Sequence, residues 1–258
     1  MIYTKKQIEQ YLERIQYGSW VAFNEQTLRD LQIAHLTHIP YENLDVLKGI
    51  PVSLDSEALF NKMILGKRGG YCFELNGLYS NLLKSLGFRV TNYLGRFIIG
   101  YNSVQMRRHR ILKVATNDGV FICDVGVRSE SYRAPLYFIE KKVQSDGISE
   151  YKLVRDDFYG WILCMRESGK DWKKIYGFTE EPQLDLDYVM PSFFCEKHPD
   201  SEHNKFRKIS IFTANSQIGL VDNELKVYKN AKIDQKKRLQ NEEEIHEVLR
   251  TVFGIENI

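Results

Sequence analysis

The chain has 258 residues, of which 43% are hydrophobic and 27% are charged, and its formal net charge is +2. This is the composition of an ordinary globular domain, and the near-balance of charge gives no argument for a nucleic-acid partner. No apolar run approaches the length of a membrane-spanning helix, and the first residues lack the apolar core of a signal peptide. The four cysteines lie far apart without metal-type spacing, so we expect reduced thiols in a cytoplasmic protein, with no metal and no membrane partner.

The first third of the chain predicts helices. Thr4, with Gln7 three residues later, forms a capping box before a helix-period apolar stripe. A second helix is predicted from about Gln26 to Thr37, ahead of Pro40, which cannot continue a helix. A third helix is predicted after Ser53.

Cys72 is the first candidate for chemistry. Gly69 and Gly70 break the preceding segment, and a helical apolar pattern then runs from Leu75 to a closing glycine at Gly87. Cys72 therefore falls at a helix start, where the helix dipole favours an anion and lowers the pKa of a thiol. The alternative is that Cys72 is a small buried hydrophobic residue, as most free cysteines are.

From about Val90 to about Val227 the pattern changes to that of β-strands. Two of these strands, 108–115 and 119–125, are separated by turn residues and should form an antiparallel hairpin. His109 lies at the beginning of the first strand, and Asp124 lies at the end of the second.

Two registers of this hairpin are open. If Val114 pairs with Gly119, His109 lies directly opposite Asp124 on the same face. A tighter two-residue turn would instead pair Asp124 with Lys113 and leave His109 four residues away.

The first register would suit acyl-transfer chemistry. Asp124 would fix the tautomer of His109, and the free imidazole nitrogen would accept the proton of a thiol. Taken singly, His109 could be a surface strand residue and Asp124 a simple strand end. The order Cys72, His109, Asp124 is what favours a catalytic set.

The sequence resembles the arylamine N-acetyltransferases over nearly its whole length. The likeness is carried by several separated segments: 39–45 (IPYENLD), 68–76 (RGGYCFELN), His109, 124–126 (DVG), 190–192 (MPS), 198–201 (HPDS) and 253–255 (FGI). The central cysteine motif is long and specific.

This resemblance implies an α+β fold in three parts. They are an N-terminal helical region over 1–88 that carries the cysteine, a central antiparallel β-barrel over 89–204 that carries the histidine and the aspartate, and a C-terminal α/β lid over 205–258.

The resemblance also implies a two-step (ping-pong) reaction. The cysteine takes an acetyl group from acetyl-CoA as a thioester and passes it to the nitrogen of an arylamine or hydrazine. Cys72 corresponds to the nucleophile, His109 to the base and Asp124 to the orienting acid. Tyr41 stands where the family usually has Phe beside the acceptor pocket. The sequence leaves the oligomeric state open.

The clearest departure follows Gly126, where the family usually continues Phe-Gly and this chain has Val127-Arg128. Val127 should widen the substrate pocket, which Tyr41 also lines. Gly126 and Arg128 are the candidate cofactor-binding residues. Arg128 would either hold the CoA phosphates, obstruct the usual cofactor path or point to solvent.

Other functions fit the same residues. An amide synthase or another acyltransferase would use a different thioester donor, a transglutaminase-like hydrolase would cleave an amide, and a binding module would retain an inactive site. Two charged features have structural interpretations: Arg68 pairs with Glu42, and the basic run 232–238 is a solvated face or a phosphate contact.

Overall fold

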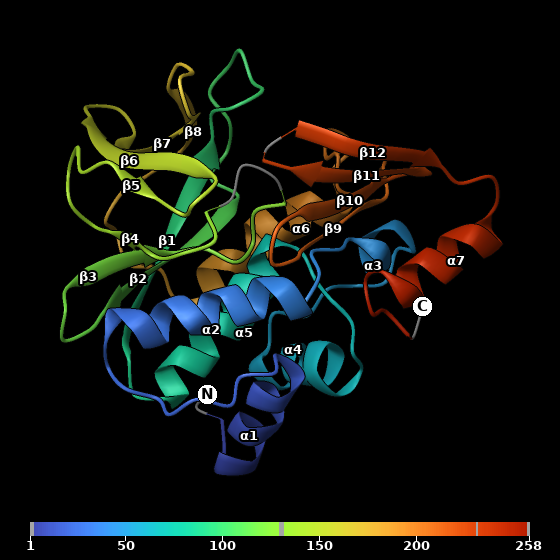
Figure 1. Cartoon of the computed structure of the whole chain (residues 1–258), viewed down its shortest axis with the longest axis horizontal. Helices are drawn as coiled ribbons and strands as arrows, with labels where there is room; N and C mark the ends of the chain where they lie inside the picture. Colours follow the sequence, from blue (N-terminus) through green and yellow to red (C-terminus); the bar gives the residue numbers. More distant parts are fainter. Residues whose placement is uncertain (1–2, 129–131, 231, 257–258) are drawn as a thin grey trace.

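The computed structural model describes residues 3–128, 132–230 and 232–256, and its first third is helical (Figure 1). The elements are α1 (Lys5–Arg14), α2 (Glu25–His38), α3 (Leu44–Leu47), α4 (Ser56–Phe60), the π-helical turn η1 (Asn61–Leu65) and α5 (Cys72–Ser85). The Thr4–Gln7 capping box opens α1 as predicted. α5 lies against α4 and the first two barrel strands, so the helix that begins at Cys72 is buried between the helical region and the barrel.

Eight antiparallel strands form a sheet that nearly closes into a barrel. They are β1 (Arg89–Phe97), β2 (His109–Ala115), β3 (Val120–Cys123), β4 (Leu136–Tyr137), β5 (Gln144–Ser145), β6 (Ser149–Asp156), β7 (Gly160–Glu167) and β8 (Lys173–Phe178), in the order β4-β3-β2-β1-β8-β7-β6-β5. The Gln144 side chain joins the two outer strands, because its amide accepts from the Tyr137 N–H at 2.6 Å and donates to the Tyr137 carbonyl at 3.0 Å. The predicted α+β fold with an antiparallel barrel is confirmed.

A second, four-stranded antiparallel sheet follows. It consists of β9 (Lys208–Phe212), β10 (Gln217–Val221), β11 (Glu224–Lys229) and β12 (Lys232–Arg238), in that order. The last helix, α7 (Glu242–Thr251), packs Ile245 and Leu249 against this sheet (Figure 1). The basic run 232–238 is the edge strand β12, and all seven of its side chains are exposed. This exposure agrees with both interpretations of the run, a solvated face and a phosphate contact.

The prediction of strands from Val90 to Val227 is wrong in one place. The 3₁₀ turn η2 (Asp185–Tyr188) and the helix α6 (Val189–Lys197) interrupt the strands. A short apolar run without clear alternation does not distinguish a strand from a helix. Here tertiary contacts decide, since one face of α6 is buried against the start of α5 through the Tyr71–Ser192 hydrogen bond of 2.5 Å. No helix in the described parts of the chain is long and apolar enough to cross a membrane.

A buried ion-pair network lies beneath the start of α5. Arg68 contacts Glu42 at 2.8 Å and Asp45 at 2.9 Å, which confirms the predicted Arg68–Glu42 pair. Lys62 contacts Asp45 and Glu74, each at 2.7 Å. Glu42 and Glu74 are almost fully buried, so their charges depend on these cations.

We expect Arg68→Ala to be strongly destabilising, because it leaves the Glu42 carboxylate buried without a cation. The free energy of unfolding, measured by urea denaturation at neutral pH, should fall by about 3–5 kcal/mol. The neighbouring Lys67→Ala is the control, because Lys67 and its partner Glu256 are half-exposed, and it should change stability by less than about 0.5 kcal/mol. Equal, small losses for the two variants would contradict a structural role for the network.

Candidate active site

Cys72 is the first residue of α5, and the residues before it hold the helix start in place. The N–H of Tyr71 donates to the Glu74 carboxylate at 3.0 Å, which satisfies one of the free donors at the helix start. The preceding loop passes very close to Pro40, since a Cβ at Gly69 would lie 2.0 Å from the Pro40 carbonyl oxygen. Only glycine fits there, which explains the glycines before the cysteine.

Asp124 is fully buried and accepts three hydrogen bonds. His109 Nε2 contacts Oδ2 at 2.6 Å, while the Asn76 side-chain amide and the Gly126 N–H donate to Oδ1 at 2.8 and 2.9 Å. Because Nε2 must donate to the carboxylate, the other nitrogen of His109, Nδ1, is the one free to accept a proton. Nδ1 is buried and has no hydrogen-bond partner within the described residues.

The imidazole of His109 is also held by aromatic rings. Phe97 and Tyr176 lie against it, with ring centroids 4.8 and 5.2 Å away. These contacts restrict rotation of the imidazole, so the hydrogen bond to Asp124 fixes which nitrogen is free.

Sequence reasoning did not identify Asn76 as part of the site. Its amide nitrogen also donates to the Arg110 carbonyl at 2.7 Å, and its oxygen accepts from the Val125 N–H at 2.9 Å. Asn76 therefore ties α5 to β2 and to the segment after β3. A signal was available, because Asn76 lies four residues after Cys72 and shares its helix face.

The β2–β3 hairpin adopts neither register considered from the sequence. Leu112 pairs with Cys123, so the position opposite Asp124 is Ile111. Ile111 and His109 share a face because strand side chains alternate, and diagonal neighbours on a face are within reach of each other. Neither of the two open registers occurs, and the His109–Asp124 contact forms diagonally, at 2.6 Å.

Turn geometry explains the shift in register. Gly119 was expected to begin the second strand, but it belongs to the turn with a positive φ of 148°. Its carbonyl accepts from the Thr116 N–H at 2.8 Å, which closes a loop of residues 116–119. The pair next to the turn is therefore Ala115 with Val120, and not Val114 with Gly119.

The expectation of a lowered pKa for Cys72 is wrong for this arrangement. Burial raises the pKa of the Cys72 thiol well above its usual range, and the charges of Cys195 and Asp124 act in the same direction. Arg108 and the Phe73 N–H at the helix start lower this pKa, but they do not outweigh burial. The thiol is therefore protonated at neutral pH unless a base removes the proton.

A cavity of about 290 Å³ opens onto Cys72. The structure brings all four of the predicted binding residues to its wall: Tyr41, Gly126, Val127 and Arg128. The sequence analysis missed Phe97, Arg108, His203 and Lys208, which also line it. His203 is partly buried there, and desolvation lowers its pKa to about 3, so its imidazole is neutral at neutral pH.

Gly126 lies directly against the cysteine. A Cβ at this position would be 2.8 Å from the Cα of Cys72 and 2.6 Å from the amide nitrogen of Asn76. Val127, the next residue, is buried and packs in the barrel core. The second sheet holds Tyr41 in place, because the backbone of Tyr41 forms two hydrogen bonds of 2.9 Å with the backbone of Ser210 in β9.

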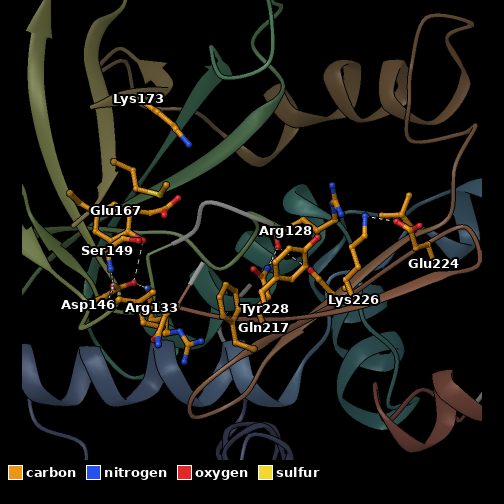
Figure 2. A pocket seen from close by; sticks show the side chains of 18 residues that line it. Arg128, Arg133, Asp146, Ser149, Glu167, Lys173, Gln217, Glu224, Lys226 and Tyr228 are labelled. Atoms are coloured by element: carbon orange, nitrogen blue, oxygen red, sulfur yellow. Dashed lines mark hydrogen bonds and ion pairs between the residues drawn. The ribbon is translucent and has the colours of Figure 1, made fainter. Parts of the chain in front are cut away.

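Arg128 also lines a second cavity, of about 370 Å³, between the barrel and the second sheet (Figure 2). Figure 2 shows Arg128 beside Gln217 and Tyr228 of the second sheet, whereas Arg133 and Asp146 lie on the barrel side. The Arg128 carbonyl accepts from the Ser210 hydroxyl and the Gln217 amide. No carboxylate among the described residues forms an ion pair with the Arg128 guanidinium.

The described residues contain no group of three or more His, Cys, Asp or Glu side chains that could hold a metal ion. The four cysteines are all buried free thiols. The site therefore offers one thiol on a cavity wall and one hydrogen-bonded imidazole–carboxylate pair, which the N–H of Gly126 ties to the same wall. Arg108, Arg128 and Lys208 add cations to this wall.

Comparisons with known proteins agree on one family. Residues 25–257 match a protein-family model described as N-acetyltransferase. The chain is 31% identical to an arylamine N-acetyltransferase of Escherichia coli (strain K12) over 96% of this chain and 88% of that protein. The solved arylamine N-acetyltransferase from Salmonella typhimurium superposes with a TM-score of 0.93 at 30% identity, covering 98% of this chain and 92% of that one. The Mycobacterium marinum arylamine N-acetyltransferase in complex with CoA superposes with a TM-score of 0.88 at 30% identity, covering 96% and 92%.

We expect iodoacetamide to modify Cys72 before the other three cysteines at neutral pH. Cys72 lines a cavity, and we expect His109 to draw off its proton. His109→Gln should slow this labelling at least about tenfold, because the raised thiol pKa then leaves little thiolate. Peptide mass spectrometry over time measures both effects, with Cys72→Ala as the unlabelled control. Earlier labelling of Cys123, Cys164 or Cys195 would contradict the assignment.

Proposed function

Because this chain belongs to the arylamine N-acetyltransferase family and is therefore an acyltransferase, we propose that it transfers an acetyl group from acetyl-CoA to the amine of an arylamine or hydrazine through a thioester on Cys72. The observations that carry this proposal are the buried His109–Asp124 pair and the thiol of Cys72, which lines a cavity and lies 3.7 Å from the carbonyl oxygen of Arg108, the residue before His109. Such a set suits nucleophilic acyl transfer.

The first half-reaction begins with proton transfer from the Cys72 thiol to Nδ1 of His109. Asp124 stabilises the imidazolium that forms, since its carboxylate lies 2.6 Å from Nε2. The thiolate then attacks the carbonyl carbon of acetyl-CoA. The new bond to Cys72 replaces the bond to the CoA sulfur, which leaves with the proton from His109.

The second half-reaction runs the same groups in the other direction. The acceptor amine attacks the thioester carbonyl, and His109 takes a proton from its nitrogen. The new carbon–nitrogen bond replaces the bond to Cys72, whose sulfur recovers the proton from His109. One thiol and one imidazole thus serve both steps.

The two cavities support separate places for the substrates. We assign Tyr41 and Val127 to the acceptor pocket, because both line the cavity at Cys72 and neither lines the second cavity. We assign Gly126 and Arg128 to the CoA thioester, because Gly126 touches Cys72 and Arg128 borders both cavities. The related M. marinum structure is a complex with CoA, which supports a CoA thioester as donor.

A second candidate function keeps the chemistry and changes the donor. Val127-Arg128 replaces the usual Phe-Gly, and the Arg128 guanidinium has no ion-pair partner in the described parts of the chain. This favours, as the alternative, an amide synthase or acyltransferase that uses a thioester other than acetyl-CoA.

We also propose a cytoplasmic location and the three-part division 1–88, 89–204 and 205–258. The four buried free thiols support a reducing compartment. The division follows the change from helices to barrel at β1 and the start of the second sheet at β9.

The direct test of the proposed function is isolation of the acyl-enzyme. Incubation with acetyl-CoA alone should add one acetyl group to the Cys72 peptide, and Cys72→Ala should take up none. With an arylamine present, double-reciprocal plots at varied donor should be parallel, because one thiol serves both substrates in turn. Intersecting lines with no isolable adduct would show direct transfer in a ternary complex instead.

Arg128→Gln should show whether the Arg128 guanidinium holds the phosphates of a CoA thioester. If the guanidinium holds a CoA phosphate, the KM for acetyl-CoA should rise at least about threefold. The KM for S-acetyl-N-acetylcysteamine, a thioester without phosphates, should not change. Steady-state kinetics with both donors on both proteins makes the comparison. An unchanged KM for acetyl-CoA would show that Arg128 does not bind the donor phosphates.

A further inference from the structure

Arg108 is a buried cation on the wall of the reaction cavity. Only 8% of this residue is exposed, and it lines the same cavity as the Cys72 thiol. Its carbonyl oxygen lies 3.7 Å from the Cys72 sulfur. The proposed reaction uses the neighbouring His109 but gives the Arg108 side chain no role.

The Arg108 guanidinium is held among other residues of the cavity wall. Its Nη2 donates to the Tyr101 hydroxyl at 2.8 Å, and its carbon lies 5.7 Å from the centre of the Tyr101 ring. After desolvation, the Arg108 charge is the largest influence that lowers the pKa of His203, which also lines the cavity. Burial raises the pKa of the Cys72 thiol, and the same charge acts against this rise. The positive charge therefore reaches the reacting sulfur.

No carboxylate among the described residues forms an ion pair with Arg108. Glu202, on the same cavity wall, pairs with Lys208 at 2.8 Å. Lys208 lowers the pKa of Glu202 most, and Arg108 adds to this effect from beyond ion-pair distance. Asp124 and Glu196 have hydrogen-bond donors of their own on both carboxylate oxygens.

A buried arginine without a carboxylate partner is an unusual feature of a protein interior. Burying an unpaired charge is unfavourable, and the neutral Tyr101 hydroxyl does not cancel it. The planar guanidinium binds a carboxylate through two parallel hydrogen bonds. Arg108 thus provides a preformed place for a carboxylate that the substrate brings into the cavity.

The position of Arg108 beside Cys72 favours a carboxylate on the acyl group. In the thioester the acyl group is bonded to the Cys72 sulfur. The free carboxylate of a short dicarboxylic acyl group lies only a few bonds from the thioester carbonyl. A carboxylate on the acceptor, as in para-aminobenzoate, lies across a benzene ring from the attacking nitrogen and hence farther from the sulfur.

We propose that Cys72 also takes short acyl groups with a free carboxylate, such as malonyl or succinyl groups from CoA, and that Arg108 binds this carboxylate. The proposal rests on the proposed thioester reaction, and the same bonds form and break. The Cys72 sulfur replaces the CoA sulfur on the acyl carbonyl, and the amine nitrogen then replaces the Cys72 sulfur. The free carboxylate takes no part in the chemistry, so the product is an N-malonyl or N-succinyl arylamine.

Matched pairs of donors test this proposal on the wild-type chain. Malonyl-CoA is compared with propionyl-CoA, and succinyl-CoA with butyryl-CoA, because the members of each pair have equal carbon chains and differ in the free carboxylate. The acceptor is para-methoxyaniline, which has no carboxylate. The kcat/KM should favour the dicarboxylic donor at least about tenfold in one pair or both, since a site built to bind a polar group rejects the analogue that lacks it.

Arg108→Gln should lose this preference, with the ratio of kcat/KM within the pair falling at least about tenfold. Because each ratio is taken within one protein, any general effect of Arg108 on the Cys72 thiol cancels. Arg107→Gln is the matched control, since Arg107 pairs with Glu181 at 3.2 Å and does not line the cavity. It should keep the wild-type ratio. Circular dichroism and acylation by acetyl-CoA check that each variant is folded.

Two results would overturn the proposal and leave the proposed function intact. One is a wild-type protein that is acetylated on Cys72 but prefers the dicarboxylic donor in neither pair. The other is an Arg108→Gln variant that keeps the preference, or that loses rate only with para-aminobenzoate as acceptor, since the bound carboxylate would then belong to the acceptor. Failure of every CoA thioester to acylate Cys72 would overturn the proposed function, and this proposal with it.

Discussion

The arrangement of the site depends on one buried carboxylate. Asp124 can remain charged in the interior only while hydrogen-bond donors surround it. Those donors come from β2 through His109, from α5 through Asn76, and from its own chain through Gly126. Meeting this one requirement sets the position of α5 against the barrel. Because Cys72 begins α5, the same requirement sets the position of the thiol.

The reaction therefore does not depend on an intrinsically acidic thiol. Burial makes the Cys72 proton hard to lose, and the helix start compensates for this only in part. In the proposed reaction the imidazole of His109 removes the thiol proton, which the helix start alone does not release. The imidazole can do so only while Asp124 holds it in one tautomer. A buried thiol of this kind has the advantage that it stays largely neutral, and hence unreactive, unless the base beside it is correctly placed.

Local patterns in the sequence predicted much of the fold and the central residues of the site. The capping residue Thr4 and the glycines before Cys72 act through their own neighbours, so they can be recognised without tertiary information. His109 and Asp124 lie on the same face, as expected, although the register differs from both that were considered. The observed register is shifted from each of them by an even number of residues, and an even shift keeps every side chain on its face. The contacts of Asn76, His203 and α6 could not be predicted in the same way, because they depend on how separate elements pack.

The exposed strand β12 has a consequence for the behaviour of this protein at high concentration. An edge strand offers free backbone groups to which a strand of another molecule can add, which is a common route to aggregation. Here the edge carries four lysine or arginine residues and one aspartate, all exposed. A second copy of the strand, paired antiparallel about Gln235, would bring Lys232 against Arg238 at both ends of the edge. We expect the basic run to prevent a strand of another molecule from adding to the edge of the second sheet. This role would explain the positive charge of β12 without any bound ligand.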